Sequence, residues 1–255
     1  MSEIFQQALG ETIPLLRSVD AGIVRRPKAS RRALEELRAA AMKPRDGTAM
    51  IWTWERLEEA ILGCVKCPHL VASRSKVVFG TGDRNAELMF VGEAPGADED
   101  LQGEPFVGKA GQLLTKIIEA MGFSRAEVFI ANVLKCRPDM PPGESGNRKP
   151  KPEEMATCLP WLREQIELVR PRALVALGAT AAEGLLGETR PLRDIRGSWL
   201  DFQGIPVLVT YHPAYLLRNQ SITEKRKVWE DMLQVLRKLG KTVSAKQERF
   251  FTQPA

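Results

Sequence analysis

The sequence predicts an α/β fold of three layers, in which a four-stranded parallel sheet is flanked by helices. Short apolar runs recur along the middle of the chain, and helical patterns separate them. The runs are continuous rather than alternating, which is typical of strands that helices cover on both faces. Strand–helix–strand alternation favours parallel pairing. The length of 255 residues suits one sizeable domain with modest extensions.

The expected elements follow one another along residues 88–239. The strands are Leu88–Val91, Val128–Ala131, Leu174–Leu177 and Val207–Thr210. The helices are Gly111–Met121, Pro152–Val169, Thr180–Leu186 and roughly Thr223–Leu239. Thr180 and Glu183 have the spacing of a capping box, which predicts a helix start at Thr180. Ser124 and Glu127 share that spacing directly before a strand, so only a helical turn is expected there.

The two ends of the chain carry no chemical motif. Residues 1–50 are expected to form a partly ordered N-terminal extension, with a basic helix from Ser30 to Met42. Residues 51–240 are expected to hold the functional domain, and residues 241–255 a polar, frayed tail. Secretory signals and long apolar runs are absent, which indicates a cytoplasmic protein without a membrane partner. The net charge of +5 fits a polyanionic partner but does not establish one.

Polar side chains follow the predicted strands at the points where these end. Gly92-Glu93-Ala94-Pro95-Gly96 follows the first strand, Asn132 ends the second, and His212 follows the fourth. Because the carboxyl ends of parallel strands meet at one edge, these groups are expected to converge there. The absence of G-x-G-x-x-G spacing argues against a dinucleotide site. Phe106, in a loop rich in turn residues, fits either a small core plug or a platform for a stacked base.

Four cysteines are present, and they match the number that fills a Cys₄ site. Cys64 and Cys67 form a C-x-x-C pair, Cys136 follows the second strand, and Cys158 lies in the next helix. Disulfides are rare in a cytoplasmic chain, so a metal or cluster site is the stronger interpretation. Spacing alone does not separate zinc from iron–sulfur. His69 is not expected to be a ligand, because four thiolates already suffice.

Together these motifs resemble the family 4 uracil-DNA glycosylases, the iron–sulfur type, over about Leu57–Leu239. The matching segments occur in the family's order. They are Cys64-Val65-Lys66-Cys67-Pro68, Val78-Phe79-Gly80, Gly92-Glu93-Ala94-Pro95-Gly96 with Glu99-Asp100, Pro105-Phe106-Val107-Gly108, Asn132-Val133-Leu134-Lys135-Cys136-Arg137-Pro138, Asn147-Arg148 before Cys158, and His212-Pro213-Ala214.

The resemblance implies a uracil-DNA glycosylase-like fold, a [4Fe-4S] cluster on all four cysteines, and hydrolysis of the N-glycosidic bond of deoxyuridine in DNA. Uracil would be flipped out and released, leaving an abasic site. By motif position, Gly92, Glu93 and Ala94 would line the uracil pocket. Phe106 would stack on the base and Asn132 would read its edge. His212 would contact its carbonyl, and Glu93 and His212 would be catalytic.

The resemblance also implies that the partner is uracil-containing DNA, single- or double-stranded. It further implies that the protein is a monomer and is associated with the nucleoid. Arg137, Arg148 and Arg218 are candidate phosphate contacts, although solvated surface arginines are the simpler interpretation. Leu216 and Leu217 follow His212 and would either wedge into the duplex or begin a helix and pack inward.

Three alternatives stand beside this prediction. One is a protein that traps uracil-DNA covalently and does not turn over; relatives of that kind carry an extra histidine in the loop corresponding to Arg137–Thr157, which has none here. Another is a non-catalytic iron–sulfur module accessory to a polymerase, against which the joint presence of the four pocket residues argues. The third is a glycosylase that also removes hypoxanthine or other deaminated bases. How thymine is excluded stays open, because Ala94 and Gly96 stand where another uracil-DNA glycosylase family has Asp and Tyr.

Overall fold

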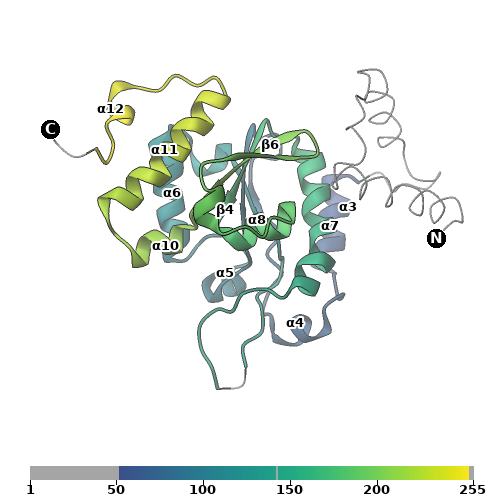
Figure 1. The fold of residues 1–255 in the computed structure, drawn as a ribbon. Helices are drawn as coiled ribbons and strands as arrows, with labels where there is room; N and C mark the ends of the chain where they lie inside the picture. Colours follow the sequence, from purple (N-terminus) through teal and green to yellow (C-terminus); the bar gives the residue numbers. More distant parts are fainter. Residues whose placement is uncertain (1–51, 142, 253–255) are drawn as a thin grey trace, which may run out of the picture. The chain divides into compact units, whose positions relative to one another are not determined.

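A six-stranded sheet forms the centre of the fold in the computed structural model, which describes residues 52–141 and 143–252 (Figure 1). Its strand order is β1-β3-β2-β4-β6-β5. The strands are β1 (Thr81–Gly82), β2 (Leu88–Gly92), β3 (Phe129–Asn132), β4 (Ala173–Leu177), β5 (Trp199–Phe202) and β6 (Ile205–Thr210). The four inner strands β3, β2, β4 and β6 pair in parallel, which confirms the predicted parallel sheet.

Two antiparallel strands extend the predicted sheet at its edges. β1 pairs with β3, and β5 forms a hairpin with β6 through Gln203 and Gly204. The sequence prediction missed both edges for a physical reason. β1 has only two residues, and β5 is half-exposed, so neither contributes the continuous apolar run that identified the inner strands.

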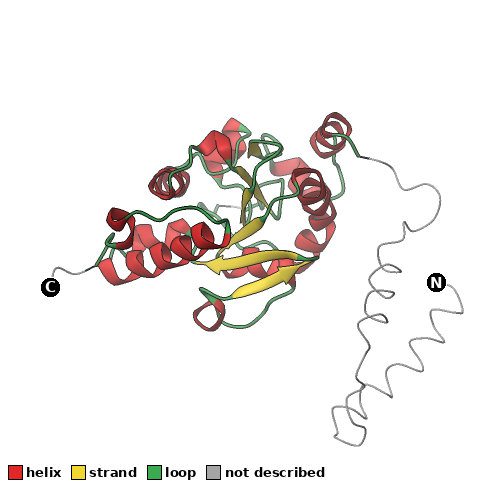
Figure 2. Cartoon of the chain, turned by 90° about the horizontal axis from the view of Figure 1, so that it is seen from above, coloured by secondary structure: helices red, strands yellow, loops and turns green. Residues whose placement is uncertain are grey.

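Helices cover both faces of the sheet, as the prediction of three layers requires (Figure 2). Alternate residues of β2 supply two separate cores: Met89 and Val91 belong to one, Leu88 and Phe90 to the other. The helices are α3 (Trp54–Leu62), α4 (Pro68–Ser73), α5 (Ala97–Gln102), α6 (Lys109–Met121), α7 (Pro152–Val169), α8 (Ala179–Leu186), α9 (Leu192–Ile195), α10 (Pro213–Arg218), α11 (Ile222–Lys238) and α12 (Ala245–Glu248), with a 3₁₀ turn η1 (Arg125–Glu127). Helices α3, α7 and α8 pack in the first core, and α6 and α11 in the second.

The two predicted capping boxes have different outcomes. Ser124 precedes η1, and its backbone N–H donates to Glu127 Oε2 at 2.6 Å, which confirms the expected turn. The prediction of a helix start at Thr180 is wrong, because α8 begins at Ala179 and Gly178 is its N-cap. Gly178 has a φ of +94° that a residue with a side chain rarely adopts, and it lets the chain turn sharply from β4 into α8.

The described part of the expected frayed tail, residues 241–252, contains a helix and is packed against the domain, which differs from the expectation. Helix α12 lies beside α11, where Trp229 Nε1 donates to the carbonyl of Gln247 at 2.6 Å. The side chain of Gln247 in turn donates to the carbonyl of Ala120, near the end of α6, at 2.9 Å. Phe250 packs on Trp229 with ring centroids 5.1 Å apart. Apolar and amide contacts therefore fix this segment despite its polar composition.

The predicted N-terminal extension, residues 1–50, and its basic helix Ser30–Met42 lie outside the described residues. Among the helices that the structure describes, none combines the length and apolarity that a membrane crossing requires.

Candidate active site and the cysteine-lined cavity

The groups predicted to converge lie at the carboxyl edge of the parallel strands. Gly92 ends β2 and is in register with Asn132, which ends β3. His212 follows Thr210, the last residue of β6. Beyond β3 the chain stays beside the end of β2, because the N–H groups of Val133 and Leu134 donate to the carbonyls of Gly92 and Glu93 at 3.0 and 3.1 Å. The end of β2 and the chain that follows β3 are therefore held together by the backbone itself.

Asn132 and Phe106 meet at Gly92. A β-carbon on Gly92 would overlap Asn132 Oδ1 and would lie 2.6 Å from the Phe106 ring, so only glycine fits. Asn132 is 2% exposed, and its Oδ1 is buried without a hydrogen-bond partner within the described part of the chain. A buried acceptor without a partner is costly unless a ligand supplies the donor. The geometry thus marks this oxygen as a contact point for a ligand.

The loop that carries Phe106 is held in an uncommon conformation. Phe106 has a φ of 54°, in the left-handed region, and its side chain is buried. Glu99 Oε1 accepts from the N–H groups of Val107 and Gly108 at 2.9 and 3.0 Å, and its Oε2 accepts from Gly96 N at 3.1 Å. At Gly111 on α6 a β-carbon would overlap the Phe106 carbonyl. Backbone strain of this kind gathers at ligand clamps and persists only where surrounding contacts enforce it.

His212 faces the same ring. The imidazole and the Phe106 ring stack with centroids 5.6 Å apart and an interplanar angle of 29°. His212 is the N-cap of α10, and its Nδ1 accepts from Ala214 N at 3.1 Å. Because Nδ1 accepts, the proton of the neutral ring is assigned to Nε2, which leaves Nε2–H as a donor. Burial lowers the pKa of His212 to about 4, Arg218 acts in the same direction, and Glu99 opposes both.

A pH prediction follows from this lowered pKa. The folded chain keeps His212 neutral, so its contribution to stability is fully present above its ordinary pKa of 6.5 and is lost as the pH falls to about 4. We expect the ring protons of His212 to titrate near pH 4 in an NMR titration. The sequence has two histidines, so a His69→Gln variant assigns the signals. A His212 midpoint near 6.5 would contradict the assignment of His212 as a half-buried, neutral donor.

Glu93 faces helix α8, where Thr180 lies. Burial raises the pKa of Glu93, and the neighbouring Thr180 hydroxyl and Lys149 oppose that shift. Thr180 is buried, and the sequence analysis assigned it to helix capping instead of to this site. The position of a polar residue in the first turn after a strand is the signal that could have identified Thr180 as a site residue. Ala94, the next residue after Glu93, packs against the core formed with α3, α7 and α8.

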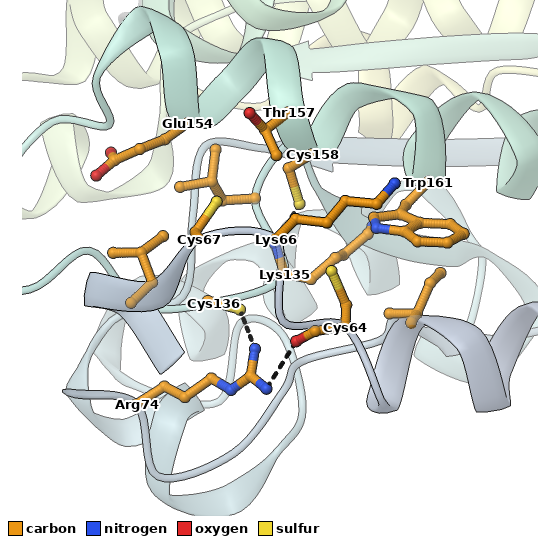
Figure 3. A pocket seen from close by; sticks show the side chains of 13 residues that line it. Cys64, Lys66, Cys67, Arg74, Lys135, Cys136, Glu154, Thr157, Cys158 and Trp161 are labelled. Atoms are coloured by element: carbon orange, nitrogen blue, oxygen red, sulfur yellow. Dashed lines mark hydrogen bonds between the residues drawn. The ribbon is translucent and has the colours of Figure 1, made fainter. Parts of the chain in front are cut away.

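The four cysteines line one cavity, although they come from three separate segments (Figure 3). Cys64 and Cys67 lie between α3 and α4, Cys136 follows β3, and Cys158 lies on α7. All four are free thiols. Hydrogen-bond donors face two of the sulfurs: Arg74 donates to Cys136 Sγ at 2.9 Å and also to the Cys64 carbonyl at 2.9 Å. The backbone N–H of Lys135 donates to Cys158 Sγ at 3.3 Å. The cavity therefore offers donors to sulfur.

The four thiols surround the cavity without meeting at one point. Among the described residues, no three cysteine sulfurs lie within 4.8 Å of one another. Four thiols around one cavity are the donor set of a Cys₄ metal or iron–sulfur site.

His69 does not line the cavity of the four cysteines. Its Nε2 lies 2.8 Å from Glu154 Oε1, and with Asp139 these residues form a compact group of possible ligands. Arg148 occupies that group, since it donates to both Glu154 oxygens at 2.9 and 2.6 Å and also pairs with Asp139. An arginine inside the group makes it an ion-pair network.

The three arginines proposed as phosphate contacts have different surroundings. Arg218 is exposed at the end of α10. Arg137 is half-buried and donates to the Gly146 carbonyl at 2.8 Å, and Arg148 is engaged by Asp139 and Glu154. Leu216 packs inward at 4% exposure, as the helix interpretation expected, whereas Leu217 is 39% exposed.

Comparisons with known proteins are consistent over most of the described chain. The family model of the uracil DNA glycosylase superfamily matches residues 79–233. A type-4 uracil-DNA glycosylase of Thermotoga maritima is 43% identical over 180 residues, which cover 70% of this chain and 90% of that protein. The type-4 enzyme of Pyrobaculum aerophilum is 42% identical, covering 66% and 86%, and that of Archaeoglobus fulgidus is 37% identical, covering 75% and 94%.

Proposed function

The chain belongs to the uracil-DNA glycosylase superfamily and is an N-glycosyl hydrolase that excises uracil in DNA repair. On that premise, we propose that its base pocket is formed by Gly92, Glu93, Ala94, Phe106, Asn132 and His212. One observation carries the proposal: Asn132 Oδ1, which is buried and has no hydrogen-bond partner among residues 52–141 and 143–252, lies beside the Phe106 ring at Gly92. A base in a duplex is unreachable, so uracil enters this pocket flipped out of the helix.

Phe106 and Asn132 recognise the flipped base. Stacking on an aromatic ring contributes about 1–3 kcal/mol per base, which offsets part of the cost of unstacking. Asn132 presents an acceptor and a donor from one amide. Oδ1 accepts from the N3–H of uracil and Nδ2 donates to O4. Cytosine offers an acceptor at N3 and a donor at its amino group, so the same amide rejects it.

His212 stabilises the leaving group. Breaking the glycosidic bond leaves negative charge on uracil and positive charge on the sugar. The neutral ring donates through Nε2–H to the departing uracil anion, and this hydrogen bond is stronger in the transition state than in the ground state. The Phe106 stacking contact keeps the imidazole at the base platform, so the donor needs no reorientation during the reaction.

Glu93 acts on the sugar side of the bond, where its carboxylate orients water or stabilises the cationic sugar. We expect Glu93→Gln to lower the single-turnover rate of uracil release by about a hundredfold or more, because the charge is lost while the shape is kept. The rate is measured on a uracil oligonucleotide under enzyme excess. Glu119→Gln, at an exposed glutamate on α6, is the matched control. An unchanged rate in Glu93→Gln would remove the residue from the mechanism.

We propose that the cysteine-lined cavity holds a [4Fe-4S] cluster, with Cys64, Cys67, Cys136 and Cys158 as its ligands. The four free thiols around one cavity and the donors from Arg74 and Lys135 support this assignment. When bound, the cluster would supply a structural cross-link between segments far apart in the sequence. Its ligands would join the segment before α4 to the chain that leaves β3 and to α7, and would support the loop that carries Arg137 and Arg148.

Uracil-containing DNA, single- or double-stranded, is the proposed partner of a monomeric enzyme, with Arg218, Arg137 and Arg148 as phosphate contacts. We expect Arg218→Ala to weaken DNA binding across sequences and to reduce the slope of log K against log salt by about one, since one phosphate contact is lost. Fluorescence anisotropy over a salt series measures both. Arg193→Ala, another exposed arginine, is the control. An unchanged slope would contradict the contact.

One assay tests the whole function. The purified protein is incubated with oligonucleotides that carry uracil, thymine or hypoxanthine, and abasic sites are then cleaved with alkali and counted. Turnover on uracil, without strand cleavage before alkali, supports the proposal. Product that is stoichiometric with the protein and stays attached to it would support the covalent trap instead. Equal cleavage of the hypoxanthine strand would support a glycosylase that removes several deaminated bases. Iron and sulfide analysis of the same preparation tests the cluster separately.

A further inference from the structure

Lys135 is a buried cation that the steps above do not use. Its side chain is 2% exposed. The ammonium donates to the backbone carbonyl of Asn132 at 2.9 Å and to Gln165 Oε1 at 2.5 Å. The orientation of the Gln165 amide is fixed, because its Nε2 donates to the Phe79 carbonyl at 2.9 Å. Lys135 is therefore held by two neutral acceptors, one of which belongs to the residue that reads uracil.

Among the described residues, the acceptors of this ammonium are two neutral oxygens and no carboxylate. Lysine is almost never fully buried unless it is paired, since an uncompensated buried charge is strongly destabilising. Lys135 also lines the cavity that holds the four cysteines, so thiolates bound there would supply the anionic side of a pair.

The backbone of Lys135 ties the same residue to the proposed cluster ligands. Its N–H donates to Cys158 Sγ, its carbonyl accepts from Val78 N at 2.7 Å, and the following residue is Cys136. Arg74 faces the cavity from another segment and donates to Cys136 Sγ (Figure 3). Asn132, three residues before Lys135, ends β3 with its side-chain oxygen at the base platform. One short segment therefore serves both the pocket and the cavity.

We propose that Lys135 is a positioning residue that couples the cluster to uracil recognition: the anionic thiolate-ligated cluster compensates its buried ammonium, and the ammonium holds the Asn132 carbonyl in place. The inference rests on the proposed cluster and base pocket. With the cluster bound, the charge of Lys135 is balanced and the turn from Asn132 to Lys135 is fixed. Without it, the same charge opposes burial and loosens that turn.

The first test is the reduction potential of the cluster. Net charge and hydrogen bonds near the sulfurs set the potential of an iron–sulfur centre. Removal of a buried positive charge in Lys135→Met favours the oxidised, less negative cluster. We expect a shift to more negative potential that corresponds to at least a tenfold change in the redox equilibrium, or about 59 mV for one electron. Spectroelectrochemistry measures it.

Lys66→Met is the matched control for that shift. Lys66 lines the same cavity, but its side chain is exposed and its ammonium lies over the Trp161 ring, 4.3 Å from the centroid. Solvent screens its charge, so its removal is expected to move the potential much less. Equal potentials in Lys135→Met and the wild type would overturn the compensating role of Lys135.

The second test keeps the proposal testable if Lys135→Met binds too little cluster for its potential to be measured. The Tm of the wild type and of the variant is measured with the cluster and after its removal. We expect cluster removal to lower the Tm of the wild type more than that of Lys135→Met, because only the wild type keeps an uncompensated ammonium. Equal losses would contradict the coupling. Lys135→Gln is neutral but retains a hydrogen-bond donor. We expect it to show the same reduced loss of Tm on cluster removal as Lys135→Met. We also expect it to raise the KM for uracil-DNA less than Lys135→Met does.

The outcomes separate this inference from the proposed function. Wild-type protein without iron or without uracil release would refute the cluster or the enzyme assignment itself. Wild-type protein with both, combined with unchanged potential, unchanged cluster-dependent Tm and unchanged KM in Lys135→Met, would leave the enzyme intact and overturn the role of Lys135 alone.

Discussion

Replacement of Asn132 by aspartate is expected to lower kcat/KM for uracil excision by about a hundredfold to a thousandfold, the range seen when one oriented donor is removed from a site where charge develops. The side chain keeps its size and loses its donor. A carboxylate would face O4 of uracil with an acceptor, and two acceptors repel. Because Asn132 Oδ1 is buried and has no hydrogen-bond partner among the described residues, the substitution breaks no other hydrogen bond of this oxygen.

The same substitution should narrow the preference for uracil over cytosine. A carboxylate accepts from the amino group of cytosine, as acidic side chains do in readout of that base. Oligonucleotides with a single uracil or a single cytosine, assayed in parallel, give the ratio of the two kcat/KM values. Asn85→Asp, in the exposed turn before β2, carries the same chemical change away from the site and serves as control. A kcat/KM for uracil within twofold of the wild type would remove Asn132 from base reading.

Cys158→Ser is expected to abolish cluster binding and to lower the free energy of unfolding by about 4 kcal/mol or more, the range associated with loss of a structural metal site. Cys158 lies on α7, whereas its proposed co-ligands lie before α4 and after β3. Loss of the cluster would therefore remove the link between the segment before α4, the chain after β3 and α7. Iron content, visible absorption and denaturant unfolding of the purified variant measure the effect.

Thr157→Ser provides the control for Cys158→Ser. Thr157 is the neighbouring residue on α7 and lines the same cavity, but it offers no thiolate. We expect full iron content and wild-type stability for this control. Cys158→Ser protein that retained a full complement of iron and the wild-type unfolding midpoint would show that Cys158 is not a ligand.

The parallel core of the fold could be predicted because its signals are local. Helix α7 has the predicted bounds Pro152–Val169, since proline is favoured in the first turn and Pro171 follows its end. Strands β2 and β4 are apolar over four or more consecutive residues, as strands buried on both faces must be. Convergence of Asn132 and His212 at one edge followed from topology alone.

Other parts of the site depend on contacts between distant segments, which a single sequence does not reveal. Thr180 has the local pattern of a helix cap, yet Gly178 takes that role and Thr180 lies beside Glu93. Lys135 has the pattern of a surface lysine after a strand, and only its tertiary contacts with Gln165 and Asn132 show that it is buried. The polar C-terminal segment is ordered by Trp229 and Gln247, whose partners lie in α11, α12 and α6.

The close approach of Gly111 to the Phe106 carbonyl has a consequence for how mutations in this enzyme are interpreted. Gly111 lies in the first turn of α6, where alanine would be the conservative choice by helix propensity alone. Here even a methyl group would displace the backbone that presents the aromatic ring, so a change that improves the helix would impair the enzyme. In a mutational scan this glycine would behave like a pocket residue, and no substitution at position 106 would relieve the clash, because the contact is with the backbone of that residue.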